Sequence, residues 1–462
     1  MQVDGLERVS EGGARRGSGG ARDSPLAAAL LVGFLALALG LVGLGAKSLW
    51  FDEAFDAVHA SGSWHDVLSS ALGHEASQAA YLIVLKPWLS VVPDDEWWLR
   101  LPSVLFIAAA AGMLVLLGTV LLDHRAGVIG GLLLAVNGFV VAWSQQARTY
   151  ALVVLAVIVS TYLLVRALEP GAGRGRWVAY GAVAALSLYA HFFAGFVIAA
   201  HVVSAVVARP RPRTDHLLVA GTIIGAGALP AVWFATARDV GQISWIVPLS
   251  LGGVKGAVEE ASGRNLLLVG LAVAGGALLA WSPPANASRA TRALLVCWAA
   301  LPFVLAVAVS VGKPILLGRY LIVATPALAL LGAVAITSIR YRPLAYVTLA
   351  GCLAIGAART VQWYRAPSVE GWREAIAYVD ANRGANDQVF VEPREDDEPY
   401  RYYAGRPSAK GEPVSRKLWV VLGAETSRAA LDGARAAVGS GLYRLHVARG
   451  RDEVFVVRGA RG

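Results

Sequence analysis

Charged residues are scarce in this sequence of 462 residues: they make up 16% of it, whereas hydrophobic residues make up 56%. Soluble domains contain roughly a quarter charged residues. The mean hydropathy is +0.56, and the apolar residues gather in long runs of the kind that cross bilayers. The shortage of charge therefore excludes an ordinary soluble domain and predicts a polytopic membrane protein.

Cysteine is nearly absent, and so are the motifs of nucleotide binding. The two cysteines, Cys297 and Cys352, lie inside apolar runs, so they offer neither a disulfide framework nor a zinc site, and we interpret them as packing residues. No Gly-rich phosphate loop precedes a helix, and no region resembles a Rossmann domain. We therefore expect no nucleotide cofactor and no soluble nucleotide-sugar donor.

About eleven apolar runs are long enough to span a bilayer. They cover residues 26–46, 101–122, 126–143, 148–168, 177–190, 192–208, 216–236, 264–282, 292–311, 320–338 and 343–361. The net charge is +9, but Lys and Arg form short clusters between the runs, so the charge indicates topology and not nucleic-acid binding. Every second connection is basic, which predicts a cytoplasmic N-terminus and a multi-pass protein of the cytoplasmic membrane.

Three regions follow from this pattern. Residues 1–24 are Gly-rich and predicted to be a disordered cytoplasmic tail, and residues 25–361 form the transmembrane domain. From Ala366 the composition becomes that of a soluble domain, with a helix at 369–383 capped by Ser368 and a second near 426–438. Strands are predicted at 388–392, 418–422, 442–448 and 453–457. We expect an extracytoplasmic α/β domain over residues 366–462.

The first outer loop, residues 47–100, is longer than a plain connector, and such loops tend to be functional. It contains two amphipathic stretches predicted to be surface helices, 63–72 with Ser63 as its cap, and 79–91. The loop opens with Asp52-Glu53, directly after the first apolar run. Charged residues at that position call for an explanation.

Asp52 and Glu53 are the candidate catalytic residues. A carboxylate there can act as a general base on a hydroxyl acceptor, or the pair can hold a divalent cation with His74 and Glu75. Alternatively, both acids stabilise the N-terminus of a helix that follows Phe51. His191, at another outer span end, is a further candidate for contact with an acceptor or a metal, although a lone histidine is more often part of the core.

Basic residues at the outer span ends break the positive-inside pattern, so they need anionic partners. These are Lys86, Arg100, Arg148 and Arg319. A lipid-anchored phosphate would provide such a partner, since Arg binds phosphate through two parallel hydrogen bonds and Lys as a point charge. The alternatives are snorkelling to lipid head groups or pairing with nearby carboxylates.

Six short motifs occur in an order that resembles the bacterial glycosyltransferase family 39 group. They are Leu49 to Ala54, His74-Glu75 before Tyr81 to Lys86, Leu99 to Ser103, Ala147 to Leu152, Tyr189 to Phe193, and Gly318 to Leu321. Members of this group are multi-span GT-C-type enzymes related to protein O-mannosyltransferases and lipid A aminoarabinose transferases. One departure is His74-Glu75-Ala76, where the family often has a His-Pro-Pro-like segment.

The resemblance implies inverting transfer of a mannose- or pentose-like sugar from a polyprenyl-phosphate donor to an acceptor protein, lipid or glycan outside the membrane. It places the family's acidic residue at Asp52, beside Glu53. It places donor-binding residues at Lys86, at Arg148 with Tyr150, and at Arg319 with Tyr320, and we add Arg100 to this group. The rival hypothesis is a transporter or flippase of a lipid-linked sugar, which predicts mid-bilayer charges and an internal repeat.

Overall fold

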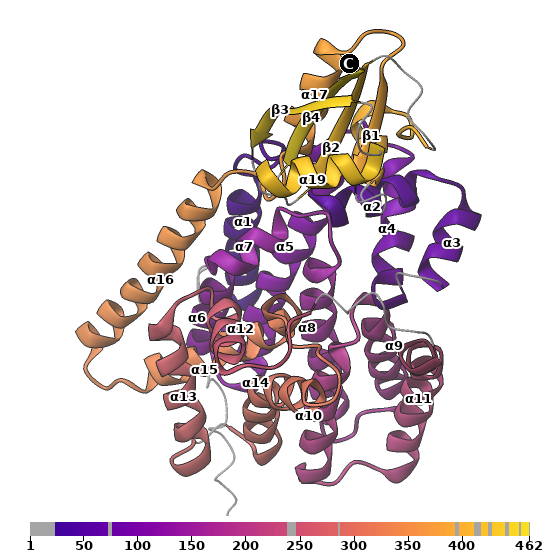
Figure 1. Cartoon of the computed structure of the whole chain (residues 1–462). Helices are drawn as coiled ribbons and strands as arrows, with labels where there is room; N and C mark the ends of the chain where they lie inside the picture. Colours follow the sequence, from indigo (N-terminus) through magenta and orange to yellow (C-terminus); the bar gives the residue numbers. More distant parts are fainter. Residues whose placement is uncertain are drawn as a thin grey trace, which may run out of the picture.

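The computed structural model describes residues 24–72, 76–237, 246–284, 287–392, 397–410, 417–423, 427–438, 443–451 and 454–461. Within these ranges a bundle of helices carries a small α/β domain at one end (Figure 1). This architecture confirms the predicted fold class, a mainly helical membrane protein with a C-terminal α/β domain. The predicted N-terminal tail lies outside the described residues, apart from Ser24.

The helical part of the chain includes the following elements, with the two 3-10 helices named η2 and η4: α1 (Pro25–Leu41), α2 (Phe51–Ser61), α3 (Trp64–Leu72), η2 (Ala76–Gln78), α4 (Ala79–Leu89), α5 (Glu96–Leu121), α6 (His124–Ala135), α7 (Gly138–Ser144), α8 (Tyr150–Ala167), α9 (Arg174–Ala190), α10 (Ala194–Val207), α11 (Thr214–Ala237), α12 (Leu251–Ala261), α13 (Leu266–Trp281), α14 (Arg289–Ser310), η4 (Gly318–Ala324), α15 (Thr325–Ser338) and α16 (Arg342–Arg365). Every apolar run predicted from the sequence contains a helix, although run 26–46 is helical only to Leu41 and run 126–143 is broken between α6 and α7. The predicted cap of α3 is also confirmed, since Ser63 accepts a hydrogen bond of 3.2 Å from the amide of Asp66.

The number of predicted membrane spans can be tested by the length of the helices, which is a stricter criterion than helicity. Among the described residues, six helices are long and apolar enough to cross a membrane. The number rises to eight if the bent pairs α6–α7 and α12–α13 each form one span. The prediction of about eleven spans is higher because α1 and α9 have 17 residues each and α10 has 14. At about 1.5 Å per residue, such helices are shorter than a hydrocarbon core of roughly 30 Å.

The centre of the bundle is α5, which packs against α1, α6 and α8. Helices α1 and α5 approach backbone to backbone: a Cβ on Gly33 would lie 2.9 Å from the carbonyl oxygen of Ala108, and one on Gly112 would lie 2.9 Å from that of Ala29. Small residues permit this close packing between membrane helices. The contact fixes the end of α1, from which the chain leads into α2.

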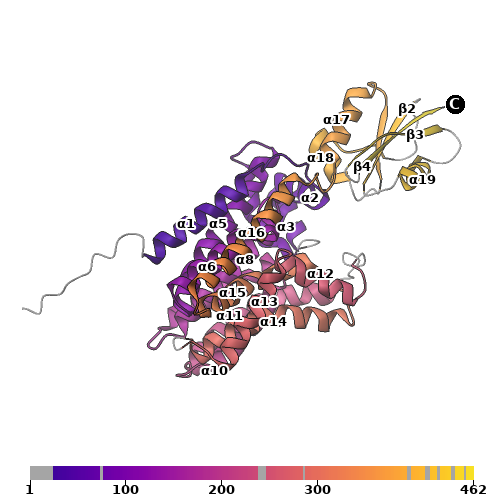
Figure 2. The same cartoon turned by 90° about the vertical axis from the view of Figure 1, so that its left-hand side faces the viewer.

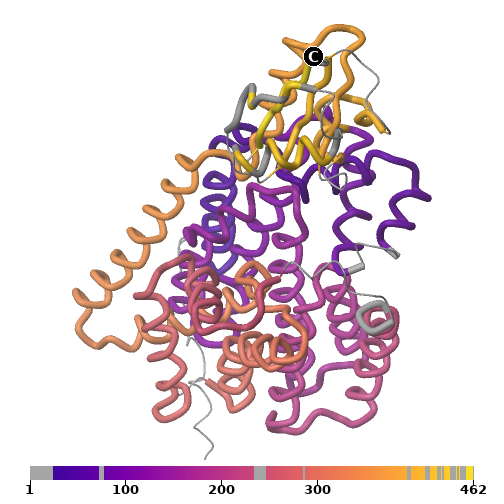
Figure 3. The backbone as a smooth tube through the Cα atoms, in the orientation of Figure 1, coloured from indigo at the N-terminus to yellow at the C-terminus, as the bar shows by residue number. Residues whose placement is uncertain are grey.

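Helix α16 runs along the outside of the bundle and ends beneath the α/β domain (Figures 1 and 3). It packs against the break between α6 and α7, where a Cβ on Gly356 would lie 2.6 Å from the carbonyl oxygen of Val136. At the same break, Asn137 caps α7 by accepting hydrogen bonds from the amides of Phe139 and Val140. Because of this cap, α7 can begin at the buried break without leaving its first amides unpaired.

The C-terminal domain contains α17 (Trp372–Asn382), β1 (Gln388–Glu392), α18 (Asp397–Ala404), β2 (Lys417–Gly423), α19 (Ser427–Val438), β3 (Tyr443–Arg451) and β4 (Val454–Arg461). The sheet has the order β1-β2-β4-β3, in which β1 and β2 are parallel and the other pairs antiparallel. Trp372, Ile376 and Val379 of α17 are buried against the sheet. Helix α18 packs on α2, which joins the domain to the first loop (Figure 2).

Two details of this domain correct the sequence-based predictions. The first helix begins at Trp372 with Gly371 as its N-cap, and not at residue 369 with Ser368 as the cap. The hydroxyl of Ser368 instead accepts a hydrogen bond of 3.0 Å from the amide of Ser48, a partner far away in the sequence. Helix α18 is absent from the sequence-based predictions; it begins at Asp397, within an acidic run whose first residues, Glu395 and Asp396, lie outside the described residues.

Candidate active site

Helix α2 carries three carboxylates in its first two turns, Asp52, Glu53 and Asp56. The first two suit the positive end of the helix dipole. The helix is held down by its buried alanines, Ala54, Ala57 and Ala60. Exposure distinguishes the three acids: the side chain of Asp52 is 24% exposed, that of Glu53 is 1% exposed, and that of Asp56 is fully buried. Asp52 is therefore the carboxylate of this helix that a substrate can reach.

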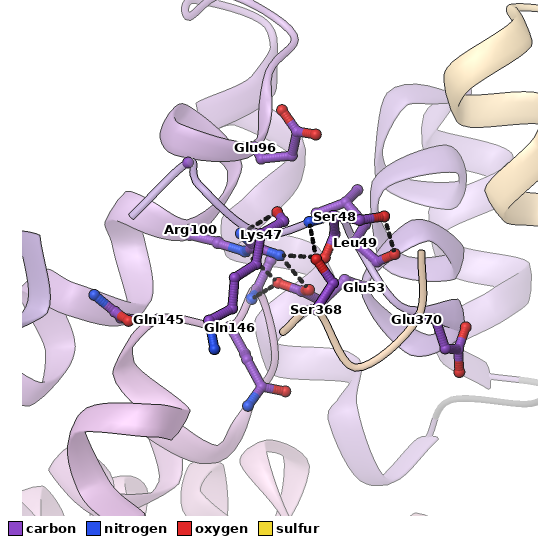
Figure 4. A network of polar contacts seen from close by, with 12 residues as sticks. Lys47, Ser48, Leu49, Glu53, Glu96, Arg100, Gln145, Gln146, Ser368 and Glu370 are labelled. Carbon is purple, nitrogen blue, oxygen red and sulfur yellow. Dashed lines mark hydrogen bonds and ion pairs between the residues drawn. The ribbon is translucent and has the colours of Figure 1, made fainter. Parts of the chain in front are cut away.

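Glu53 forms a buried pair with Arg100 of α5. Arg100 donates from Nε and from Nη2 to the two carboxylate oxygens, both at 2.7 Å. Its remaining three N–H groups reach the carbonyl oxygens of Leu44, Lys47 and Ser48 at 3.0, 2.9 and 3.1 Å (Figure 4). All five donors of the guanidinium are thus engaged, so a phosphate would have to displace one of these partners.

Arg148 lies between Asp52 and Asp56. Its Nη1 donates to a carboxylate oxygen of Asp56 at 2.8 Å and to the main-chain carbonyl of Asp52 at 2.9 Å. Its Nη2 lies 3.6 Å from the carboxylate of Asp52, an ion-pair distance beyond a normal hydrogen bond. Asp56 therefore balances most of the charge of Arg148, which leaves the Asp52 carboxylate near a cation but accessible.

Aromatic rings surround the same place. Tyr150 and Tyr320 are stacked with ring centroids 6.4 Å apart, and His191 lies 5.8 Å from the first ring and 4.8 Å from the second. The amide of Phe193 donates to Nδ1 of His191 at 3.2 Å, so the proton of the neutral ring is on Nε2. The fold thus brings together Tyr150, His191 and Tyr320, which are widely separated in the sequence, into one aromatic wall.

Arg319 connects this wall to a cavity of about 650 Å³. Its guanidinium lies 5.6 Å from the ring centroid of Trp50 and 5.8 Å from that of Tyr320, both within cation–π range. It is also close enough to Asp52 for their charges to interact. The cavity combines cations, amides and tryptophans, and its lining includes Trp50, Trp143, Gln146, Glu260, Arg264, Arg319, Arg359, Gln362 and Trp363. Such a mixture suits a sugar with an anionic group.

Lys86 of α4 lies at the other end of α2. Its ammonium donates to the carbonyl oxygens of Gly62 and Ser61, the latter at 3.4 Å. Cations stabilise helix C-termini through these carbonyls and the helix dipole. The described residues supply two acceptors, and an ammonium has three N–H donors, so the third can still contact a ligand.

The candidate metal ligands are only partly described. His74 and Glu75 lie outside the described residues. Within the described ranges, no group of three or more His, Cys, Asp or Glu side chains is arranged to hold a metal ion. Cys297 and Cys352 are free thiols, in agreement with their interpretation as packing residues.

Sequence reasoning missed three residues of this region. Asp56 had a usable signal, because it follows Asp52 by four positions and therefore shares its helix face. Glu260 of α12 covers Gly318, where a Cβ would collide with its carboxylate. Glu370 accepts a hydrogen bond of 3.0 Å from the amide of Phe51. Neither glutamate has a local sequence signal, since each contact joins distant segments.

Comparison with protein families finds the model of the dolichyl-phosphate-mannose-protein mannosyltransferases, which matches residues 78–234. This stretch contains Lys86, Arg100, Arg148, Tyr150 and His191, but neither Asp52 nor Arg319. No curated protein sequence matches the chain significantly.

Solved structures extend the similarity to nearly the whole chain. ArnT from Cupriavidus metallidurans bound to undecaprenyl phosphate aligns with a TM-score of 0.62 at 13% identity, over 93% of this chain and 97% of that one. The Archaeoglobus fulgidus oligosaccharyltransferase with zinc and sulfate aligns with a TM-score of 0.54 at 12% identity, over 94% and 72%. The archaeal oligosaccharyltransferase AglB from the same organism, with an inhibitory peptide and a dolichol-phosphate, gives 0.52 at 12% identity, over 83% and 64%.

Likeness at such low identity shows the fold, and the fold is the GT-C type. The resemblance inferred from the six motifs is confirmed at this level: the chain is similar to GT-C-type enzymes related to mannosyltransferases and aminoarabinose transferases. Together with its apolar helices, this makes the chain a multi-pass membrane protein.

Proposed function

We propose that this multi-pass membrane protein of GT-C-type fold is an inverting glycosyltransferase that takes a sugar from a polyprenyl-phosphate donor. The observation that carries the proposal is the state of Asp52. It is the partly exposed carboxylate among the three of α2, and it lies near Arg148 and Arg319. Arg319, together with Trp50, lines a cavity large enough for a sugar.

Asp52 acts as the general base. An acceptor hydroxyl attacks the anomeric carbon, its proton passes to the Asp52 carboxylate, and the bond from that carbon to the phosphate oxygen breaks. The electron pair of this bond leaves with the polyprenyl phosphate. Attack from the face opposite the leaving group inverts the configuration at the anomeric carbon.

Arg319 stabilises the charge that develops on the leaving phosphate, because a guanidinium placed where charge develops lowers the barrier. Tyr320, which is partly exposed, flanks it and provides a hydroxyl group and a ring for the sugar-phosphate, and the buried Tyr150 supports Tyr320 through their stacked rings. Lys86 caps the other end of α2, so its third N–H group can contact only a part of the donor that is distant from Arg319. Arg148 keeps Asp52 in place, while Glu53 and Arg100 have a structural role because each is fully engaged with the other and with the main chain.

Two of the similar structures support a lipid-phosphate donor. The ArnT structure contains undecaprenyl phosphate and the AglB structure contains dolichol-phosphate, together with a peptide. The donor sugar is a mannose- or pentose-like residue, and the acceptor is a protein, lipid or glycan. The alternation of basic loops supports an active site on the outer face of the cytoplasmic membrane, with the N-terminus cytoplasmic and the α/β domain outside.

The transporter hypothesis predicts a different reaction, movement of the intact lipid-linked sugar between leaflets. Its expected features are ionisable groups near mid-bilayer and two repeated halves. The charged groups of the candidate site instead gather around the start of α2. This helix packs against α18 of the C-terminal domain at one end of the bundle (Figure 1). This placement favours chemistry at the membrane surface.

The test uses the full chain in reconstituted vesicles with a set of polyprenyl-phosphate sugars labelled in the sugar. We expect wild type to release labelled sugar from the lipid, and Asp52→Asn to bind donor normally while transfer falls by about 10²- to 10⁴-fold. The control is Asp215→Asn, an exposed carboxylate on α11 that should leave transfer unchanged. Normal turnover by Asp52→Asn would refute the base, and movement of uncleaved donor by wild type would replace the enzyme with a transporter.

A further inference from the structure

The segment 45–51, which links α1 to α2, makes most of its outward hydrogen bonds to the C-terminal domain. On its inner side, Arg100 holds the carbonyl oxygens of Lys47 and Ser48. On its outer side, the partners come from residues more than 300 positions later in the chain. The segment therefore lies between two parts of the protein, and Figure 4 shows Ser368 and Glu370 approaching it.

Three amides of the segment are capped by side chains of that domain. The amide of Ser48 donates to the hydroxyl of Ser368 at 3.0 Å, and the amide of Leu49 donates to the hydroxyl of Tyr403 at 2.7 Å. The Tyr403 hydroxyl in turn donates to the carboxylate of Glu96 at 2.9 Å. Burial raises the pKa of Tyr403, so its hydroxyl stays protonated and can make both bonds.

The carbonyl groups are held by Arg373 of α17. Its guanidinium donates to the carbonyl oxygens of Gly45 at 3.2 Å and Ala46 at 2.7 Å. It also pairs with Glu96, the first residue of α5, at 3.1 Å. In addition, the amide of Arg373 donates to the hydroxyl of Ser48 at 3.1 Å. These contacts tie the linker to the start of α17 and to the start of α5.

The third capped amide is the one nearest the proposed base. Helix α2 has Trp50 as its N-cap residue, and an indole cannot accept a hydrogen bond from the first amides. The carboxylate of Glu370 accepts instead, from the amide of Phe51 at 3.0 Å, and also from the indole of Trp372. A negative group there also suits the helix dipole. The next residue along the helix is Asp52.

We propose that Glu370 is a positioning residue for Asp52, so that the C-terminal domain forms the outer layer of the active site. This inference rests on the proposed function in assigning the chemistry to Asp52. Glu370 fixes the first turn of α2 and hence the position of the Asp52 carboxylate relative to Arg148 and Arg319. Because it does not touch the donor, it acts on the rate of transfer and not on donor binding.

The kinetic test compares Glu370→Ala with Glu370→Gln in vesicles. A misplacement of the base by about 1 Å costs about 100-fold, so Glu370→Ala should lower kcat by about 10- to 100-fold with an unchanged donor KM. A glutamine oxygen can still accept both hydrogen bonds, and only the interaction of the negative charge with the helix dipole is lost. The kcat of Glu370→Gln should therefore stay within about fivefold of wild type. Asp432→Asn, an exposed acid on α19, is the control and should match wild type.

Two further variants separate positioning from general damage. Tyr403→Phe keeps the buried ring but removes the hydroxyl that caps the amide of Leu49. Its kcat should be lower than that of wild type, as in Glu370→Ala, without a change in donor KM. In an Asp52→Asn background, Glu370→Ala should cause no further loss, because its effect passes through that carboxylate. An equal further loss there, or a rise in donor KM as large as the fall in kcat, would overturn the positioning role.

Hydrogen–deuterium exchange provides a readout that needs no activity. In Glu370→Ala, amides of residues 48–57 should exchange faster than in wild type, whereas those of α5 and α8 should not change. Unchanged exchange in residues 48–57 would refute the inference even if transfer is confirmed. If the wild type transfers no sugar but Glu370→Ala still exchanges faster, the capping contact stands and only the proposed function is refuted.

Discussion

Arg100 donates two hydrogen bonds of 2.7 Å to the carboxylate of Glu53, and both side chains are almost completely buried. Removing one partner of a buried pair leaves an uncompensated charge, which costs about 3–5 kcal/mol. Glu53→Gln should therefore lower the unfolding free energy of the purified protein by about this amount, as measured by thermal unfolding in detergent. Glu169, which is partly exposed and paired with Arg166 and Arg176, is the matched control, and Glu169→Gln should cost about 1 kcal/mol or less. Equal stability losses in the two variants would contradict the structural role of the buried pair.

Asp56→Asn should slow transfer although Asp56 does not reach the cavity. Of Asp52 and Asp56, only Asp52 would then remain as an anionic neighbour of Arg148. A full ion pair between Arg148 and Asp52 would make Asp52 a weaker base. We expect kcat to fall by about tenfold or more while the donor Kd stays constant. Steady-state kinetics with parallel donor binding measure both values. The double variant Asp52→Asn/Asp56→Asn should be no slower than Asp52→Asn, and additive losses would disprove the coupling.

Arg319→Ala should weaken donor binding. A hydrogen bond to a charged group contributes about 1.5–3 kcal/mol, so the Kd for a polyprenyl phosphate should rise by about 10- to 100-fold. Arg319→Lys should recover part of the affinity, because an ammonium binds phosphate as a point charge. Titration of a labelled polyprenyl phosphate into the protein in nanodiscs measures this, with Arg213→Ala, 75% exposed and on the far loop, as the control. Unchanged affinity in Arg319→Ala would show that the donor phosphate does not bind at Arg319.

Gly318→Ala should disturb the same arginine indirectly. A Cβ at this position collides with the Glu260 carboxylate, so the Glu260 side chain must leave its place over η4, and Arg319 is the next residue. We expect a reduced donor affinity and a reduced rate. Gly312→Ala is the matched control, since a Cβ there meets open space. If the two alanine variants behave alike, the close packing of α12 on η4 does not set the position of Arg319.

The sequence predicted the helices well because apolar runs and caps are local signals. The Ser63 cap and the four strands of the C-terminal domain follow from patterns within a few residues. The alternative that outer arginines pair with nearby carboxylates was also available from the sequence, and it describes Arg100 and Arg148. Lys86, in contrast, lies at the C-terminus of α2, which no pattern around residue 86 indicates.

Long-range contacts explain what the sequence did not predict. Ser368 is a residue type that often caps helices, but its hydroxyl accepts a hydrogen bond from the amide of Ser48 instead, and α17 starts later. The division of labour among Asp52, Glu53 and Asp56 depends on Arg100 and Arg148, which come from other elements. Exposure of a carboxylate is a property of the assembled fold, so adjacent acids with different roles look alike in the sequence.

The capping of Phe51 by Glu370 joins positions 319 residues apart, and this separation has a consequence for biogenesis. A ribosome that adds about 5–20 residues per second needs about 15 to 65 s to synthesise the stretch between them. Throughout this interval the start of α2 lacks its cap, although the helices that surround it, from α5 to α16, are being added. A chain that ends before Glu370 therefore has the proposed base without its positioning contact, and we expect it to transfer sugar more slowly than the full chain.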